Sequence, residues 1–168
     1  MIRPIRALLL VAVAILLPAC YHMRVLPEPI KPRTVITVQT PEEALRRIRQ
    51  VLDQELHIHV IGEEQGGSVL ITAPHHFHTD TGFGQPPGGR RYYVQLRIAV
   101  EGEGSRAVIT VAAQTFELRT SYAYSDEGQL HTLTKYYPYE EYPGMFDTGI
   151  MTREIRDLGG LIERAMKD

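Results

Sequence analysis

The sequence predicts an α+β fold: an antiparallel β-sheet of about four to seven strands with two helices packed on one of its faces. Short segments of alternating apolar and polar residues fill the middle of the chain, as expected for half-buried strands. One amphipathic helical pattern precedes most of them, and a second ends the chain. Strands grouped between two helices favour an antiparallel sheet with its helices on one side. The expected order is β-α-β-β-β-β, then a further hairpin that the sequence leaves open, then α.

The first 19 residues have the layout of a secretory signal. Arg3 and Arg6 give a positive start, the run from Ala7 to Leu17 is apolar throughout, and small Ala19 precedes the expected cut point. This apolar run is too short for a transmembrane helix, which needs about 20 residues. Residues 1–19 are therefore expected to be removed.

Leu17-Pro18-Ala19-Cys20 ends this leader and contains the only cysteine of the chain. The motif resembles the lipobox of bacterial lipoproteins. The resemblance implies that Cys20 carries a thioether-linked diacylglyceryl group and an acylated amine, and two or more acyl chains anchor a protein stably to a membrane. Tyr21 stands where lipoproteins of the enteric inner membrane typically have Asp, so the expected location is the outer membrane of a Gram-negative bacterium, facing the periplasm. The alternative is an ordinary signal peptide followed by an incidental cysteine.

The remaining 149 residues suit one domain, residues 33–168, behind a short tether, residues 20–32. The leader holds two of the 18 basic residues and none of the 20 acidic ones, so the mature chain has four more acidic than basic residues. This balance does not indicate a nucleic-acid partner. With Cys20 lipidated, no disulfide is available, and the domain must be stabilised by burial alone.

The tether contains three prolines and is expected to be extended, holding the domain a few tens of Å from the membrane at about 3.1 Å per residue. A short β-branched strand is expected at Thr34–Val38. Thr40 is expected to cap a helix, because a proline occupies the first helical position and Glu43 completes a capping box. Apolar residues at helical spacing continue this helix to about Glu55.

The segment Leu56–Val60 alternates apolar residues with histidines and predicts a strand. A turn over residues 62–67 would join it to a second strand, Ser68–Thr72, as a hairpin. Residues 74–91 contain four glycines and three prolines and predict a long mobile loop. A loop of this length in a compact domain is either functional or disordered.

The centre of the sheet is expected to be the hairpin of Tyr92–Glu101 with Arg106–Leu118. A third hairpin, over residues 120–125 and 129–137, is a further expectation, and residues 136–146 should be irregular. The inward positions of the first strand are Tyr92, Val94, Leu96, Ile98 and Val100.

The final helix has one apolar stripe and two adjacent glycines. Thr148 or Thr152 is expected to cap it. Gly159 and Gly160 either kink it or allow close packing on the sheet, and close packing is favoured. The stripe consists of Met151, Ile155, Leu158, Ile162 and Met166.

Five histidines form a candidate metal site: His57, His59, His75, His76 and His78. The first two are expected to share one side of a strand, and His76 and His78 one side of an extended segment. Imidazoles at this spacing can bind zinc, copper or nickel if the strand register brings them together. The alternative is that they are solvated side chains on the wet face of a strand.

Six of the nine tyrosines lie between Tyr122 and Tyr142. Tyrosine is enriched in protein interfaces, so this proline-stiffened strip is a candidate protein interface. The alternative is that these rings cover the open end of the sheet. The candidate interface residues are Tyr136, Tyr137, Tyr139 and Tyr142.

Catalytic motifs are not found in the sequence. There is no Gly-x-Ser-x-Gly elbow, and Gly82-Phe83-Gly84 lacks the third glycine of a dinucleotide-binding loop. The one cysteine is assigned to lipid attachment and is not free to act as a nucleophile. The chain is therefore expected not to be an enzyme.

From Thr40 to Thr72 the chain is similar to the repeating unit of BamC-like lipoproteins of the outer-membrane barrel-assembly machinery. The similarity lies in a helix, a strand ending in acidic residues and a glycine-led strand, and it implies a helix-grip-like domain. The mature start also resembles that of the lipopolysaccharide-transport lipoprotein. The matching segments are Ala44-Leu45-Arg46-Arg47-Ile48, Leu56–Glu64, Gly67-Ser68-Val69-Leu70-Ile71 and, at the start, Cys20-Tyr21-His22-Met23-Arg24.

Taken together, these observations predict a lipid-anchored cell-envelope lipoprotein that acts as a non-catalytic accessory subunit by binding a protein partner. The alternative is a periplasmic-side lipoprotein that binds a metal or small ligand in the His-rich loop or in a groove between sheet and helix. Beyond the covalent lipid, no cofactor is expected in the first case.

Overall fold

A computed structural model describes residues 26–83 and 88–167, so the leader and Cys20 lie outside the described residues. The described chain forms a seven-stranded antiparallel sheet with two α-helices, which confirms the predicted α+β class. Within these residues no helix is long and apolar enough to cross a membrane. The elements are β1 (Arg33–Thr37), α2 (Pro41–Gln50), η2 (Val51–Glu55), β2 (Val60–Glu64), η3 (Gln65–Gly67), β3 (Val69–Thr72), β4 (His75–Phe83), β5 (Gly88–Glu103), β6 (Arg106–Asp126), β7 (Gln129–Pro138), η4 (Pro143–Met145) and α3 (Thr148–Ala165).

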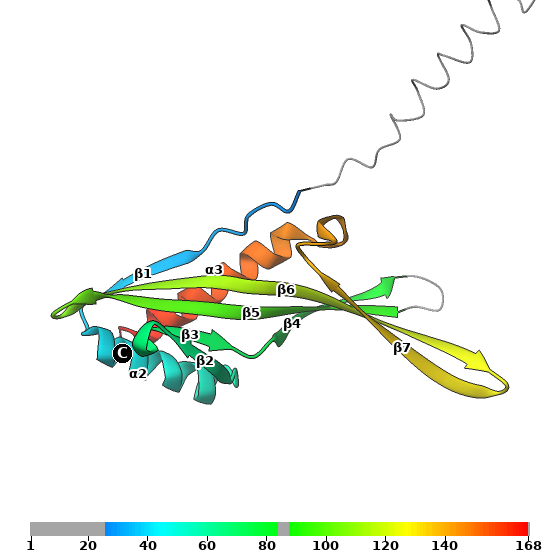
Figure 1. Cartoon of the computed structure of the whole chain (residues 1–168), viewed down its shortest axis with the longest axis horizontal. Coiled ribbons are helices and arrows are strands. Elements are labelled where there is room, and N and C mark those ends of the chain that lie inside the picture. Colours follow the sequence, from blue (N-terminus) through cyan, green and yellow to red (C-terminus); the bar gives the residue numbers. More distant parts are fainter. Residues whose placement is uncertain (1–25, 84–87, 168) are drawn as a thin grey trace, which may run out of the picture.

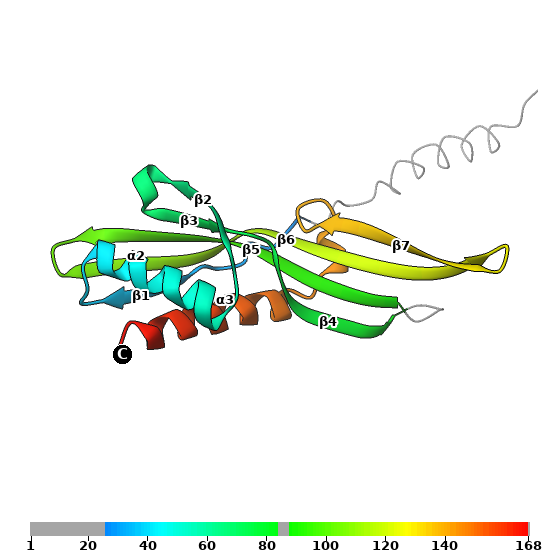
Figure 2. The same ribbon diagram turned by 90° about the horizontal axis from the view of Figure 1, so that it is seen from below.

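The long β5–β6 hairpin forms the spine of the molecule (Figure 1). Near its turn, β1 pairs with β6, and β3 pairs with β5 and carries β2. Toward its other end, β7 pairs with β6 and β4 pairs with β5. Besides pairing with each other, the two central strands thus each have two different neighbours along their outer edge: β3 and β4 for β5, and β1 and β7 for β6. The outcome is an elongated sheet with two hairpin ends, β4–β5 and β6–β7, that diverge beyond the helices (Figure 2).

Helix α2 begins as predicted. The Thr40 hydroxyl accepts a hydrogen bond from the backbone N–H of Glu43, and the Glu43 carboxylate accepts one from the Thr40 N–H, which confirms the capping box. A π-helical turn, η2, continues the helix to Glu55, the predicted end. Both helices pack on one face of the sheet, called here the inner face (Figures 1 and 2). The α2–η2 stripe of Ala44, Ile48, Val51 and Leu52 is fully buried there.

Helix α3 begins at a residue that sequence reasoning missed. Asp147, and not Thr148 or Thr152, is the N-cap, and its carboxylate accepts hydrogen bonds from the N–H groups of Gly149 and Ile150. The predicted apolar stripe is buried. Gly159 is buried against β1: a Cβ added there would lie 2.2 Å from Cγ of Arg33, whereas one added at Gly160 would meet nothing within 4 Å. The close-packing interpretation is therefore confirmed for the first glycine of the pair.

The predicted inward positions of β5, from Tyr92 to Val100, are all buried. On β6 the inward parity changes partway along the strand. Ile109 and Val111 face the core, but beyond a bulge at Gln114 the inward residues are Phe116 and Leu118. The extra residue of a bulge shifts the side-chain alternation by one position. This shift decides which side chains of the second half of β6 face outward.

Three further local predictions were wrong. Residues 74–91 are not a loop: most of them form β4 and the start of β5, whose backbone groups pair with each other. Composition suggested a break, but the glycines are concentrated near the end of this hairpin; residues 84–87 lie outside the described part. The segment 136–146 is also not irregular throughout, because β7 extends to Pro138 before residues 139–146 form turns and η4.

The third wrong prediction concerns Leu56–Val60. This segment is not a strand before Val60, because His57 has a positive φ of 53° and the N–H of Ile58 bonds to the carbonyl of Leu52. A left-handed residue directly after a helix is a common way to end it. Strand β2 therefore begins later than predicted and runs through Gly62 to Glu64, although its hairpin with β3 is confirmed.

Candidate functional site

Four side chains from four different strands line up on the outer face, the face opposite the helices. His76 of β4 lies opposite Tyr93 of β5, with ring centroids 5.4 Å apart. The guanidinium carbon of Arg119 on β6 lies 3.9 Å from the Tyr93 ring centroid and 5.3 Å from that of Tyr136, its cross-strand partner on β7. These four residues are called the ring ladder. It links the four strands through side-chain contacts, in addition to their backbone pairing.

The charge of the ring ladder is fixed by Glu117, which pairs with Tyr93 across the strands and forms an ion pair with Arg119. Partial burial lowers the pKa of the Arg119 guanidinium, but the hydrogen bond and charge of Glu117 outweigh it and raise that pKa above its ordinary value. Arg119 therefore stays protonated between two aromatic rings. A guanidinium over a tyrosine ring is stabilised by cation–π attraction of about 0.5–1 kcal/mol at exposed sites.

The ring ladder is open to solvent at its edge on β7. Tyr136 is 58% exposed, while the Arg119 and Glu117 side chains are each 32% exposed. Tyrosine and arginine held rigid by their neighbours are the side chains that most often dominate binding energy in protein interfaces. What the ring ladder can do chemically is to present a preorganised aromatic and cationic surface.

The five predicted histidines are not brought together. The bulge at Phe77 places His76 against Tyr93 on the outer face and His78 against Tyr92, which is buried on the inner face. His76 and His78 were predicted to share one side of the segment, and this prediction is wrong. Imidazoles on opposite faces of a strand cannot bind one ion.

The other three histidines lie apart as well. His57 has its Nδ1 3.2 Å from the carbonyl oxygen of Asp53, and His59 is exposed beside the end of the helix. His75 lies between β4 and α3, with Nε2 3.4 Å from a carboxylate oxygen of Glu154. Among residues 26–83 and 88–167, no three His, Cys, Asp or Glu side chains gather in a way that could hold a metal ion.

The four predicted interface tyrosines have different positions. Tyr136 belongs to the ring ladder. Tyr137 and the half-exposed Tyr142 form an edge-to-face pair with centroids 5.3 Å apart. Tyr139 is only 5% exposed and packs edge-to-face on Phe116, so it belongs to the core and does not offer an interface. The strip therefore fits each of the two interpretations in part: Tyr136 is exposed, as an interface requires, whereas Tyr139 covers the core of its own domain.

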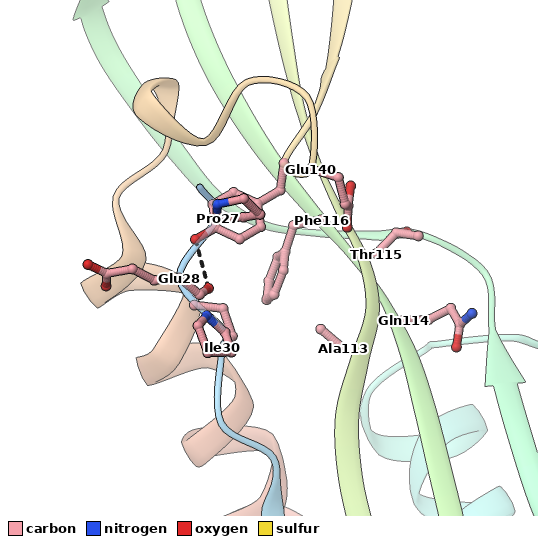
Figure 3. A pocket seen from close by; sticks show the side chains of 10 residues that line it. Pro27, Glu28, Ile30, Ala113, Gln114, Thr115, Phe116 and Glu140 are labelled. Carbon is pink, nitrogen blue, oxygen red and sulfur yellow. Dashed lines mark hydrogen bonds between the residues drawn. The ribbon is translucent and has the colours of Figure 1, made fainter. Parts of the chain in front are cut away.

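Tyr139 has a second role, because it fixes the predicted tether. Its hydroxyl donates a hydrogen bond to the carbonyl of Glu28 at 2.9 Å, and burial raises the pKa of this phenol, so it stays neutral (Figure 3). Ile30 packs against the core cluster. Residues 26–32, called the strap, therefore lie on the domain and are not a free spacer.

The strap covers a gap in the edge of β6. Pairing with β1 ends at Val111, and pairing with β7 begins at Glu117. The strap carries prolines, which cannot donate to a strand ladder, so it passes the gap without completing the sheet. An open pocket of about 300 Å³ remains between the strap and β6, and it is lined by Phe116, Tyr139 and strap residues (Figure 3).

Tyr93 and Arg119 are the ring-ladder residues that sequence reasoning missed. Tyr93 could have been placed, because it alternates with the buried Tyr92 and must face outward. Arg119 could have been placed only by recognising that the alternation of β6 restarts after Gln114.

Comparison of the chain with protein-family models and with curated proteins finds no match.

Proposed function

We propose that this chain is a non-catalytic, lipid-anchored cell-envelope protein of the periplasmic side that acts as an accessory subunit and binds a protein partner through the ring ladder. The observation that carries the proposal is the ladder itself: four side chains from four strands, with the Arg119 guanidinium between two tyrosine rings. Rigid aromatic area and a preorganised guanidinium bind with little loss of side-chain entropy. The lipobox at Cys20 supports the anchor.

The docked strap sets how far the domain can stand from the membrane. Among the described residues, the hydrogen bond nearest in sequence to Cys20 is the one at the carbonyl of Glu28, eight residues after Cys20. Eight residues span at most about 29 Å when fully extended. The domain would therefore stay closer to the bilayer than a free tether of a dozen residues would allow. Its partner should be a protein located at the membrane.

Alanine substitution in the ring ladder tests the partner proposal. The partner should no longer co-purify from crosslinked membranes with the Arg119→Ala or the Tyr136→Ala variant, because each substitution removes one side of the Arg119–Tyr136 contact. Val38→Ala is the matched control, since Val38 is exposed but lies outside the ladder. Loss of the partner in all three variants, or in none, would contradict the proposal.

The anchor is tested separately. Cys20→Ser should leave the protein unprocessed or release it from membranes while the domain remains folded. A cleaved Cys20→Ser protein that still fractionates with membranes would refute lipid attachment at this residue, whatever the outcome for the partner.

A further inference from the structure

The β6–β7 hairpin continues beyond the rest of the sheet. Pairing of β5 with β6 ends at Arg90 and Thr120, whereas pairing of β6 with β7 continues to Asp126 and Gln129. Residues 121–134 are called the arm. In the part of the chain that the structure describes, no third strand pairs with the arm, and both views show it clear of the helices (Figures 1 and 2). A two-stranded hairpin without further packing is marginally stable in water.

The two faces of the arm differ in chemistry. Alternation places small hydroxyl side chains on the outer face, where Ser121 lies opposite Thr134. On the inner face, Tyr122 lies opposite Leu133, and Tyr124 stacks on His131 with ring centroids 5.3 Å apart. This aromatic face extends past the helices that cover the inner face elsewhere. Tyr124 is 52% exposed and Leu133 47% exposed.

Charge is distributed unequally along the same face. Asp126, next to the acidic turn residue Glu127, lies on it at the tip, while Lys135 lies on it at the base, opposite Thr120. Two arms packed inner face to inner face in opposite directions would place the tip of each over the base of the other. Each Asp126 would then approach a Lys135 of the second copy.

The strand register allows this overlap to be symmetric. Ala123 pairs with Thr132 midway between Thr120 and Asp126. A two-fold axis at this row lays Tyr122 over Tyr124 of the second copy and Leu133 over its His131. Every member of the aromatic face then meets another member of that face, as a two-fold interface requires.

We propose that the arm is a self-association site, and that a second copy of this chain covers its aromatic face in the antiparallel arrangement. The face is about 20 Å long at 3.3 Å per residue and two strands wide at about 4.8 Å per strand, so its area is about 200 Å², far smaller than the roughly 800 Å² per partner of a standard stable interface. Association is therefore weak in solution and becomes effective when both copies share a membrane, which raises their effective concentration. This last step rests on the proposed lipid anchor, whereas the arrangement of the arms does not.

Photo-crosslinking in cells tests the arrangement with the full chain. A benzophenone amino acid replaces Leu133, and two differently tagged copies are co-expressed. The same replacement at Thr132, the next residue but on the outer face, is the matched control. The expected result is a covalent dimer containing both tags, with a yield about tenfold higher from position 133 than from position 132. Equal yields, or a dominant adduct with another protein, would overturn the proposal.

Charge reversal tests the direction of the overlap without altering the aromatic face. Asp126→Lys or Lys135→Glu alone should lower the dimer yield about threefold or more, because each places like charges together, and the double variant should restore it. If the double variant gives no more dimer than the single ones, the antiparallel arrangement is wrong. Tyr136→Ala should leave the yield unchanged, since it alters only the ring ladder. Membrane fractionation of the same samples reports the anchor independently.

Discussion

The two adjacent glycines of α3 should respond in opposite ways to alanine. Gly160 faces open space, so Gly160→Ala should stabilise the protein by about 1 kcal/mol through helix propensity. Gly159→Ala gains the same propensity, but its new Cβ would lie 2.2 Å from Cγ and 2.8 Å from Cβ of Arg33. The Arg33 Cβ is attached to β1, whose backbone pairs with β6, and cannot move without disturbing that pairing. Overpacking of this kind typically costs about 1–3 kcal/mol, so the net effect should be destabilising by up to about 2 kcal/mol.

Urea unfolding of the purified full chain measures both free energies of unfolding. Arg33→Ala combined with Gly159→Ala removes the 2.2 Å contact and leaves the 2.8 Å contact, so it should recover part of the loss. The ion pair of Arg33 with Glu163 is partly exposed and contributes little to this balance. If Gly159→Ala is as stabilising as Gly160→Ala, then α3 does not approach β1 as closely as described, and the packing argument is refuted.

Three further outcomes follow from single side chains. Thr40→Ala should lower the free energy of unfolding by about 1 kcal/mol in a urea titration, because it removes the N-cap of α2, and an unchanged value would contradict the capping box. The pKa of the Glu43 carboxyl is lowered, first by the backbone hydrogen bond from Thr40, so its contribution to stability is present above the ordinary value of 4.5 and lost as the pH falls through the lowered pKa; an NMR titration showing a Glu43 pKa at or above 4.5 would refute this. Tyr139→Phe should speed amide exchange and proteolysis around Glu28, because the hydrogen bond that holds the strap is lost, while Tyr142→Phe should not.

The features that could be predicted from the sequence are those set by near neighbours in the chain. The capping box of Thr40 and Glu43 depends on residues three apart, and the inward positions of β5 follow from simple alternation. The turn of the third hairpin was also predicted, and it holds Glu127 and Gly128 at positive φ, as a two-residue type I′ hairpin turn requires.

The features that could not be predicted depend on partners distant in the chain. The sequence predicts a loop in place of β4 because its glycine-rich end is typical of loops, whereas the pairing that makes it a strand comes from β5. The bulge at Phe77 separates His76 from His78, and no local pattern shows it. Tyr139 looked like an interface residue, but its place is set by Phe116 and by the strap, both remote in sequence.

The sequence indicates two of the four ring-ladder residues, but for other reasons: His76 as a metal ligand and Tyr136 as an interface residue. Only the sheet register shows that they belong to one row. Tyr93 and Arg119 complete that row from the two central strands. A cross-strand set of this kind follows from register, which alternation within single strands does not determine.

The most direct test of the central claim is photo-crosslinking from the ring ladder in living cells. A photoreactive amino acid at Tyr136, which is 58% exposed, should capture one discrete protein partner in the membrane fraction. The same group at Val38, which is 87% exposed and outside the ladder, should not capture that partner. A partner captured from position 136 alone is the result predicted here; no adduct from position 136, or the same adducts from both positions, would contradict the account.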